Sequence, residues 1–342
     1  MARTLAGKSA CATSSARARR VRREMKRVHT ASLIVCIALL PLFAFALDVP
    51  LRAQDRAFEL RRYGPVFAPP PCPRSGSGEQ MAKYEDYVIR TIDTGSYGCL
   101  EVRKAGVVVY KQSDALWYGI GNNIGGMNPG RVPAIPVGAD ITGGGIPEAI
   151  VWSWSGGMHC CYTFKILELG KQFAEVAEIS ADHSERAHFE DLRHDGKYEF
   201  VGYDSAFAYW HASFTYSPAP AVVLRPDEKG ALNYYLYHLA FDLMKRPPPT
   251  AIEFDSLVNK VKEASAWEHG GAPPELWGKM LDLIYTGHPP LTWKLLDQSW
   301  PSDKPGKGGF IGAFCDRLRE SRYWGDLSPL LSESHAPPDC LW

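Results

Sequence analysis

Two acidic, glycine-bearing segments hold the residues whose types and spacing could do chemistry. They are Asp140-Ile-Thr-Gly-Gly-Gly-Ile-Pro-Glu148 and Asp191-Leu-Arg-His-Asp-Gly-Lys-Tyr-Glu199. Each has an acid at position 1, a glycine at position 6 and an acid at position 9, and each leads into an apolar, strand-like run. Carboxylates at this spacing can bind a cation such as calcium, or accept hydrogen bonds from backbone N–H groups in a tight turn. The repeated spacing predicts a turn-then-strand unit that occurs twice.

This spacing resembles the loops of FG-GAP/VCBS-type repeats, the blades of integrin-like β-propellers, over roughly Ala139–Asp204. The loops of that family chelate calcium, so the resemblance implies calcium as a cofactor. Carried over, it implies as ligands Asp140, Thr142 and Glu148 in the first loop and Asp191, Asp195 and Glu199 in the second. Gly144 stands where the family has an acid, and Arg193 stands where it has an oxygen ligand. The alternative, in which Asp140 and Asp191 accept backbone N–H bonds, stays open.

A second set of residues could support an enzyme. His159 and Cys161 share a face of a predicted strand, where an imidazole can lower the pKa of a thiol, and His194 is a further candidate base. The acids within Asp191–Asp204 could pair as general acid and base. The chain has no Cys-x-x-Cys, His-Glu-x-x-His or Gly-x-Ser-x-Gly motif. The sequence therefore favours a non-catalytic binding or structural module, with an envelope hydrolase or thiol-dependent enzyme as the alternative.

The first 46 residues are typical of an export signal. Met25-Lys-Arg-Val-His-Thr30 is a short basic start, Ala31–Phe43 is an uncharged, mostly apolar run, and Ala44-Phe-Ala46 fits the small-x-small cleavage pattern. Either Met1 or Met25 could be the start of translation. We therefore expect a periplasmic or secreted protein. If cleavage fails, residues 31–47 would instead tether the protein to the membrane.

Charge bears on the kind of partner. Residues 1–46 hold nine Lys or Arg and one acid, and subtracting them from 38 basic and 38 acidic residues leaves 29 and 37, a net charge near −8. The remainder has no basic stretch to lie along a phosphate backbone, so the sequence argues against nucleic acid. We expect a protein or glycan ligand in the cell envelope, with membrane contact only through the signal segment if it is uncleaved.

Export also decides how the cysteines are interpreted. Outside the signal region there are six, which is most simply a set of disulfides: Cys72, Cys99, Cys160, Cys161, Cys315 and Cys340. Cys315 and Cys340 are the two cysteines of the C-terminal part, which predicts that they pair with each other. Cys72 and Cys99 are predicted to form a second pair. Neighbouring residues have Cα atoms about 3.8 Å apart across a trans peptide, below the usual disulfide range. For Cys160 and Cys161 we therefore expect one buried thiol and one partner elsewhere.

The composition and the hydrophobic pattern of the chain change along its length. Residues 47–82 are a Pro/Gly-rich lead-in, 83–226 form a β-rich domain with the two repeat-like units, and 227–342 form a helical part. The predicted fold class is α+β, with an antiparallel β-rich N-terminal part, built as open sheets or a sandwich with incomplete propeller-like units, before the helices. The pattern predicts a strand over Tyr209–Thr215 and a helix over Tyr234–Met244. Taken whole, the chain is similar to exported bacterial proteins of unknown function.

Overall fold

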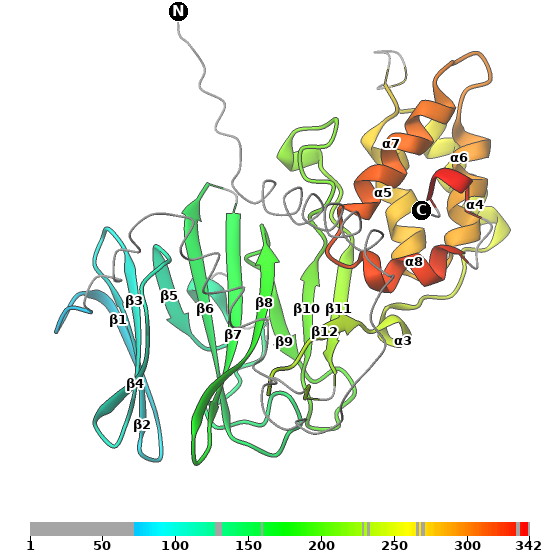
Figure 1. Ribbon diagram of the computed structural model, residues 1–342. Coiled ribbons are helices and arrows are strands. Elements are labelled where there is room, and N and C mark those ends of the chain that lie inside the picture. Colours follow the sequence, from blue (N-terminus) through cyan, green and yellow to red (C-terminus); the bar gives the residue numbers. More distant parts are fainter. Residues whose placement is uncertain are drawn as a thin grey trace, which may run out of the picture. The chain divides into compact units, whose positions relative to one another are not determined.

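The structure is a computed structural model, and it describes residues 72–126, 132–158, 160–227, 229–230, 233–264, 267, 271–332 and 336–340. The predicted signal peptide, most of the predicted lead-in and His159 lie outside these residues. Strands come first along the described chain and helices follow (Figure 1). The α+β fold class, with antiparallel strands before the helices, is therefore confirmed.

The described strands form three four-stranded antiparallel sheets, and in each sheet the spatial order of the strands follows the sequence. The first holds β1 (Ser77–Tyr84), β2 (Tyr87–Asp93), β3 (Gly98–Lys104) and β4 (Val107–Gln112). The second holds β5 (Trp117–Ile120), β6 (Glu148–Gly157), β7 (Cys160–Leu169) and β8 (Phe173–Asp182). The third holds β9 (His188–Glu190), β10 (Glu199–Tyr203), β11 (Ala221–Pro226) and β12 (Tyr237–Leu239). Such meanders form because antiparallel neighbours need only short connections.

The second sheet is buried on both faces. Alternation along β6 turns Ala149 and Val151 toward the first sheet, where they pack with Ile89 and other apolar residues of β2 and β3. Ile150 and Trp152 turn the other way, into the larger core that continues through the third sheet to the helices. Two-sided burial explains why Glu148, the first residue of β6, is followed by a continuous apolar run, Ala149-Ile-Val-Trp152, instead of alternating apolar and polar residues.

Three phenylalanines join the second and third sheets. Phe164 of β7, Phe189 of β9 and Phe200 of β10 are almost fully buried. Their ring centroids are 5.8, 5.4 and 5.2 Å apart in edge-to-face pairs. This geometry places the positive edge of one ring on the negative face of another. The cluster fixes how β10, which follows the second acidic loop, lies against β7.

The predicted strand over Tyr209–Thr215 is wrong. Tyr209 and His211 have φ of 60° and 52°, a left-handed conformation that interrupts a strand. Ser217 holds this turn, because its hydroxyl accepts a hydrogen bond from the Tyr209 N–H at 2.9 Å. A short 3-10 helix, η2 (Phe214–Tyr216), follows, and another, η1 (Ile124–Gly126), lies between β5 and β6.

The helices are α3 (Phe241–Met244), α4 (Ala251–Lys262), α5 (Pro274–Tyr285), α6 (Pro289–Ser299), α7 (Lys307–Arg319), α8 (Trp324–Ser332) and the 3-10 turn η4 (Pro338–Cys340). Helix α4 begins with a capping box, in which the side chains of Thr250 and Glu253 each accept from the other's backbone N–H. The predicted helix over Tyr234–Met244 is instead β12 followed by α3. Its apolar spacing fits a helix, but Leu239 pairs with Leu224 of β11, and the added sheet contacts decide the outcome.

A buried carboxylate joins the sheets to the helices. Asp204, just after β10, accepts hydrogen bonds from the hydroxyls of Tyr285 and Ser321 and from the backbone N–H of Ala206. Burial raises the pKa of Asp204, while the bonds from Ser321 and Tyr285 oppose that rise. The three donors compensate for the loss of water around the carboxylate.

Three disulfides occur among the described residues, and the predicted pairs Cys72–Cys99 and Cys315–Cys340 are confirmed. The expectation for Cys160 and Cys161 is wrong, because these neighbours are bonded to each other. The peptide between them is cis, and their Cα atoms are 3.1 Å apart, closer than the trans spacing on which the expectation rested. The disulfides are compatible with an exported protein. No helix in the described part of the chain is long and apolar enough to span a bilayer.

The hydrogen bonds of Asp204 predict that its removal strongly destabilises the fold. Asp204→Ala leaves two buried hydroxyls without their acceptor, so we expect the free energy of unfolding to fall by about 2–4 kcal/mol. Urea denaturation followed by tryptophan fluorescence measures this change. Asp303→Ala is the matched control, because Asp303 is exposed, and it should shift stability by less than about 0.5 kcal/mol. Equal stability of the two variants would contradict the junction's role.

Candidate functional site

The two acidic loops share one backbone arrangement. At position 1, the Asp140 and Asp191 carboxylates accept a hydrogen bond from the N–H of the position-6 glycine, Gly145 at 2.9 Å and Gly196 at 3.0 Å. Both glycines have positive φ, 75° and 81°. Position 4 is left-handed in both loops as well, with φ of 77° at Gly143 and 55° at the corresponding histidine, His194. The two loops therefore share this hydrogen bond and these left-handed positions.

At position 9, a buried glutamate closes each loop. Glu148 accepts hydrogen bonds from the N–H groups of Ile141 and Thr142 and from the Thr142 hydroxyl, at 2.7, 2.9 and 2.7 Å. Glu199 accepts from the corresponding N–H of Leu192 at 3.2 Å. The side chain at position 3 completes both arrangements, because Arg193 Nε donates to Glu199 at 2.8 Å where Thr142 donates to Glu148.

Burial sets the charge state of the first of these glutamates. It raises the pKa of Glu148 to about 7, while the hydroxyl and N–H of Thr142 and the N–H of Ile141 oppose the shift. The neighbouring Asp140 carboxylate raises the pKa of Glu148 further by repulsion. A proton on Glu148 therefore stabilises the folded chain in mildly acidic solution.

The two loops contact each other directly. The Tyr198 N–H of the second loop donates to the Ile141 carbonyl of the first at 3.2 Å. The aliphatic part of Lys197 lies so close to Gly143 that a Cβ there would be 2.8 Å from Lys197 Cδ. Gly143 is thus required both by its positive φ and by this close approach.

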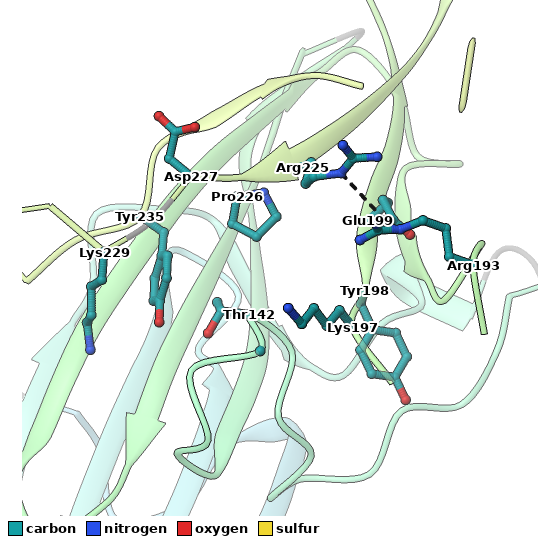
Figure 2. A pocket seen from close by; sticks show the side chains of 11 residues that line it. Thr142, Arg193, Lys197, Tyr198, Glu199, Arg225, Pro226, Asp227, Lys229 and Tyr235 are labelled. Atoms are coloured by element: carbon teal, nitrogen blue, oxygen red, sulfur yellow. Dashed lines mark hydrogen bonds and ion pairs between the residues drawn. The ribbon is translucent and has the colours of Figure 1, made fainter. Parts of the chain in front are cut away.

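A pocket of about 390 Å³ opens beside this contact. Its lining residues come from both loops and from the chain around β11: Thr142, Gly143, Arg193, Lys197, Tyr198, Glu199, Arg225, Pro226, Asp227, Lys229 and Tyr235. Figure 2 shows Thr142 and Lys197 in the middle, with Tyr235 and Lys229 to one side and Arg225 and Glu199 to the other. Four side chains of the lining are cationic and two are acidic, so the lining has an excess of positive charge although the chain beyond residue 46 is acidic.

Both acids of the pocket are already engaged. Glu199 is bound to Arg193 and to its own loop, and Asp227 lies 3.0 Å from His238. Arg225 is bonded to Asp242 at 2.8 Å, and its Nε is 4.0 Å from Glu199. That Nε is buried and makes no hydrogen bond within the described chain. The anionic neighbour of this buried donor is therefore Glu199, which lies within ion-pair distance.

The remaining two cations are lysines with different surroundings. Lys229 is paired with Glu168 of β7 and lies 5.4 Å from the ring centroid of Tyr235. Lys197 is exposed and forms no ion pair with any residue that the structure describes. The ammonium of Lys197 is therefore the group best placed to receive an anion.

The six predicted calcium ligands divide between the two loops, and most of them bond to their own backbone. Asp191 also accepts from the Asp195 N–H, and Asp195 accepts from the Lys197 N–H, both at 3.0 Å. In the described residues no group of three His, Cys, Asp or Glu side chains is arranged to hold a metal ion. Calcium binding by Asp140, Thr142, Glu148, Asp191, Asp195 and Glu199 stays a prediction.

The candidate catalytic residues that the structure describes have different surroundings. Cys161 is bonded to Cys160, so a nucleophilic thiolate would require reduction of that disulfide. His159 lies outside the described residues, and His194 is an exposed residue of the second loop. Asp191 bonds to its loop, while Asp204 is buried in the junction with the helices. The enzymatic alternative stays a prediction.

Sequence reasoning did not find the basic lining. Arg193 was visible only as a residue unsuited to calcium, and Lys197 occupied an unremarked position two residues before Glu199. Arg225 and Lys229 lie more than 25 positions further along the chain than Glu199 and come from a different element. Only pairing of β10 with β11 brings Arg225 beside the loop.

The raised pKa of Glu148 predicts a specific pH dependence. A carboxyl whose pKa rises from 4.5 to about 7 contributes stability below pH 4.5 that is lost as the pH rises through 7. In Glu148→Gln the amide oxygen can take the two N–H groups and the amide can donate to Thr142. As the pH rises through 7, we expect the free energy of unfolding of the wild type to lose this contribution of up to about 3 kcal/mol, and that of the variant not to. Urea titrations between pH 4.5 and 8 measure it.

The control for that experiment is Glu275→Gln, on the exposed side of α5, which should keep the wild-type pH profile. A Glu148→Gln profile that runs parallel to the wild type across the whole range would show that Glu148 is ionised in the fold as readily as in the unfolded chain.

Comparison with known proteins adds no relative from which function could be transferred. No protein family, no curated protein and no solved structure matches the chain. The proposals below therefore rest on the charges, contacts and exposure of the described residues.

Proposed function

We propose that the protein is an exported binding module whose pocket between the two acidic loops takes a small anion. The observation that carries this proposal is the excess of cationic side chains around a pocket of about 390 Å³ in an otherwise acidic mature chain. Pockets for small ligands combine a few polar groups with apolar walls. Here Pro226 and Tyr235 supply apolar surface, and the two loops supply the polar groups.

The loops support this proposal because they fix the position of the cations. Arg193 is held by Glu199, whose own loop is closed by backbone hydrogen bonds. The stem of Lys197 lies against Gly143, which limits where its ammonium can go. A side chain that is already ordered loses less entropy when a ligand binds. Positions fixed in this way suit a carboxylate or phosphate group better than mobile surface lysines would.

The disulfides support the exported part of the proposal. Six cysteines are joined in three pairs, a pattern that oxidising compartments favour and that the cytoplasm rarely maintains. In the periplasm or outside the cell, small carboxylates, phosphates and acidic sugars are all available. The shared chemistry that the pocket selects is a compact negative charge with an apolar part that contacts Tyr235.

Anion binding is measurable with simple probes. Isothermal titration with citrate, inorganic phosphate and glucuronate should show saturable binding of one or more of them, and glucose should show none. Added sodium chloride should weaken that binding, since salt screens exposed charges. The three anions separate carboxylate, phosphate and acidic-sugar specificity. Absence of binding by all three would overturn the proposal.

Lys197→Gln removes the charge and keeps the first two methylene groups of the stem. We expect it to weaken anion binding about threefold to tenfold, because one charge-assisted hydrogen bond is lost. Lys260→Gln, an exposed lysine on α4, is the matched control and should bind like the wild type. Equal affinities for the two variants would place the anion somewhere other than this pocket.

Calcium binding has a separate test. We expect the melting temperature to be the same in millimolar calcium and in chelator, because the loop carboxylates already accept backbone hydrogen bonds. A rise in calcium that Asp195→Asn abolishes would instead establish the site that the FG-GAP resemblance implies. Differential scanning fluorimetry of the two proteins distinguishes these outcomes.

A further inference from the structure

Three aromatic side chains lie next to one another on adjacent strands of the second sheet, away from the basic pocket. Trp117 of β5 pairs with Trp154 of β6, and Trp154 pairs with Tyr162 of β7. Cross-strand partners project from the same face of a sheet, so the three rings form a continuous row. Their centroids are 4.6 and 6.3 Å apart, and the Trp154 and Tyr162 rings are nearly parallel.

The row is accessible although its residues are large and apolar. Trp117 is 44% exposed, and Trp154 and Tyr162 are partly exposed. Trp152 lies two residues before Trp154 on the same face and is buried in the core. Trp154 therefore lies beyond the side chains that cover Trp152.

A second pocket, of about 280 Å³, lies at the Tyr162 end of the row. Trp154, Tyr162 and Phe214 form its aromatic walls, and the segment His183–Arg186 supplies polar groups. That segment contains hydroxyl, carboxylate, imidazole and guanidinium groups, so both donors and acceptors face the pocket. Among the described lining residues, the negative charge of Glu185 is matched by the positive charge of Arg186. The pocket between the loops instead has an excess of cations.

The hairpin between β6 and β7 completes this surface. Cys160, half of the disulfide with Cys161, lines the pocket together with Met158, which is 90% exposed. The Ser155 hydroxyl accepts the Cys161 N–H at 2.7 Å, so the two sides of the hairpin are tied together. The sulfur atoms and the methionine extend the apolar surface beyond the aromatic rings.

We propose that this surface binds a neutral oligosaccharide. The apolar C–H face of a sugar ring is complementary to an aromatic ring, and its hydroxyl groups require donors and acceptors at the edge of that contact. Successive rings along the row provide contacts for successive sugars. The balanced charge of His183–Arg186 selects a neutral glycan and excludes the anions that the other pocket favours.

Tryptophan fluorescence measures this interaction directly, because Trp117 and Trp154 would be covered. Titration of the full mature protein with maltohexaose, cellohexaose and chitohexaose should give a saturable change for at least one of them. Glucose should give little change at the same concentration, since a monosaccharide cannot span the row. The three oligomers separate α-glucan, β-glucan and N-acetylated glycan specificity. If none of them binds and a broader array of neutral glycans is also negative, the proposal fails.

Two variants assign the binding to this surface. Trp154→Ala should weaken the affinity at least tenfold, and its melting temperature shows whether the fold survives. Trp117→Ala alters a more exposed ring and should weaken oligosaccharide binding several-fold with the fold intact. Isothermal titration reports both without depending on the altered tryptophan.

Two controls complete the design. Ile252→Ala removes an exposed apolar side chain from α4 and should bind like the wild type. Lys197→Gln should leave glycan binding unchanged, so failure of the anion proposal and failure of this one are distinguishable. Wild-type affinity in both Trp117→Ala and Trp154→Ala would overturn the assignment to this surface.

Discussion

Two buried glutamates are the constraint on which the arrangement of this protein depends. Glu148 and Glu199 stand at the first position of β6 and β10 and accept the backbone N–H groups that their preceding loops would otherwise leave unpaired. A buried carboxyl group is tolerated only when donors replace its water, and at Glu148 the donors oppose the effect of burial on the pKa without cancelling it. Each glutamate therefore fixes the shape of a loop and the starting point of a strand together.

The functional consequences follow from the paired loops. With acids at positions 1 and 9 turned onto backbone N–H groups, the side chains at other positions define the surface between the loops. Thr142 and Arg193 fill equivalent positions but leave different charges there, and Lys197 adds a second cation beside Gly143. Cationic side chains thus line the pocket beside these two acidic loops. The aromatic row on β5, β6 and β7 depends on a different constraint, the cross-strand register of the second sheet.

Much of the fold was predictable from local pattern. Alternation, turn residues and helical spacing indicated antiparallel strands followed by helices, which is the order that the described chain has. The pattern failed where contacts outside the segment itself decide the outcome. The aromatic stretch near Tyr209 has strand propensity, yet Ser217 holds it in a turn. Residues 237–239 have helical spacing, yet they add to an existing sheet edge.

The sequence alone determined the spacing of acids and glycines in the two loops and the order of strands and helices, because each depends on residues close together in the chain. It also determined the disulfides Cys72–Cys99 and Cys315–Cys340, because each joins cysteines that lie near each other in the chain. The tertiary structure alone decided which groups the carboxylates bind, that Cys160 bonds to Cys161, and that Arg225 and Lys229 join Arg193 and Lys197 around one pocket. The physical reason is that charge and contact depend on distance in space, and the pairing of β10 with β11 is what brings Arg225 beside the second loop.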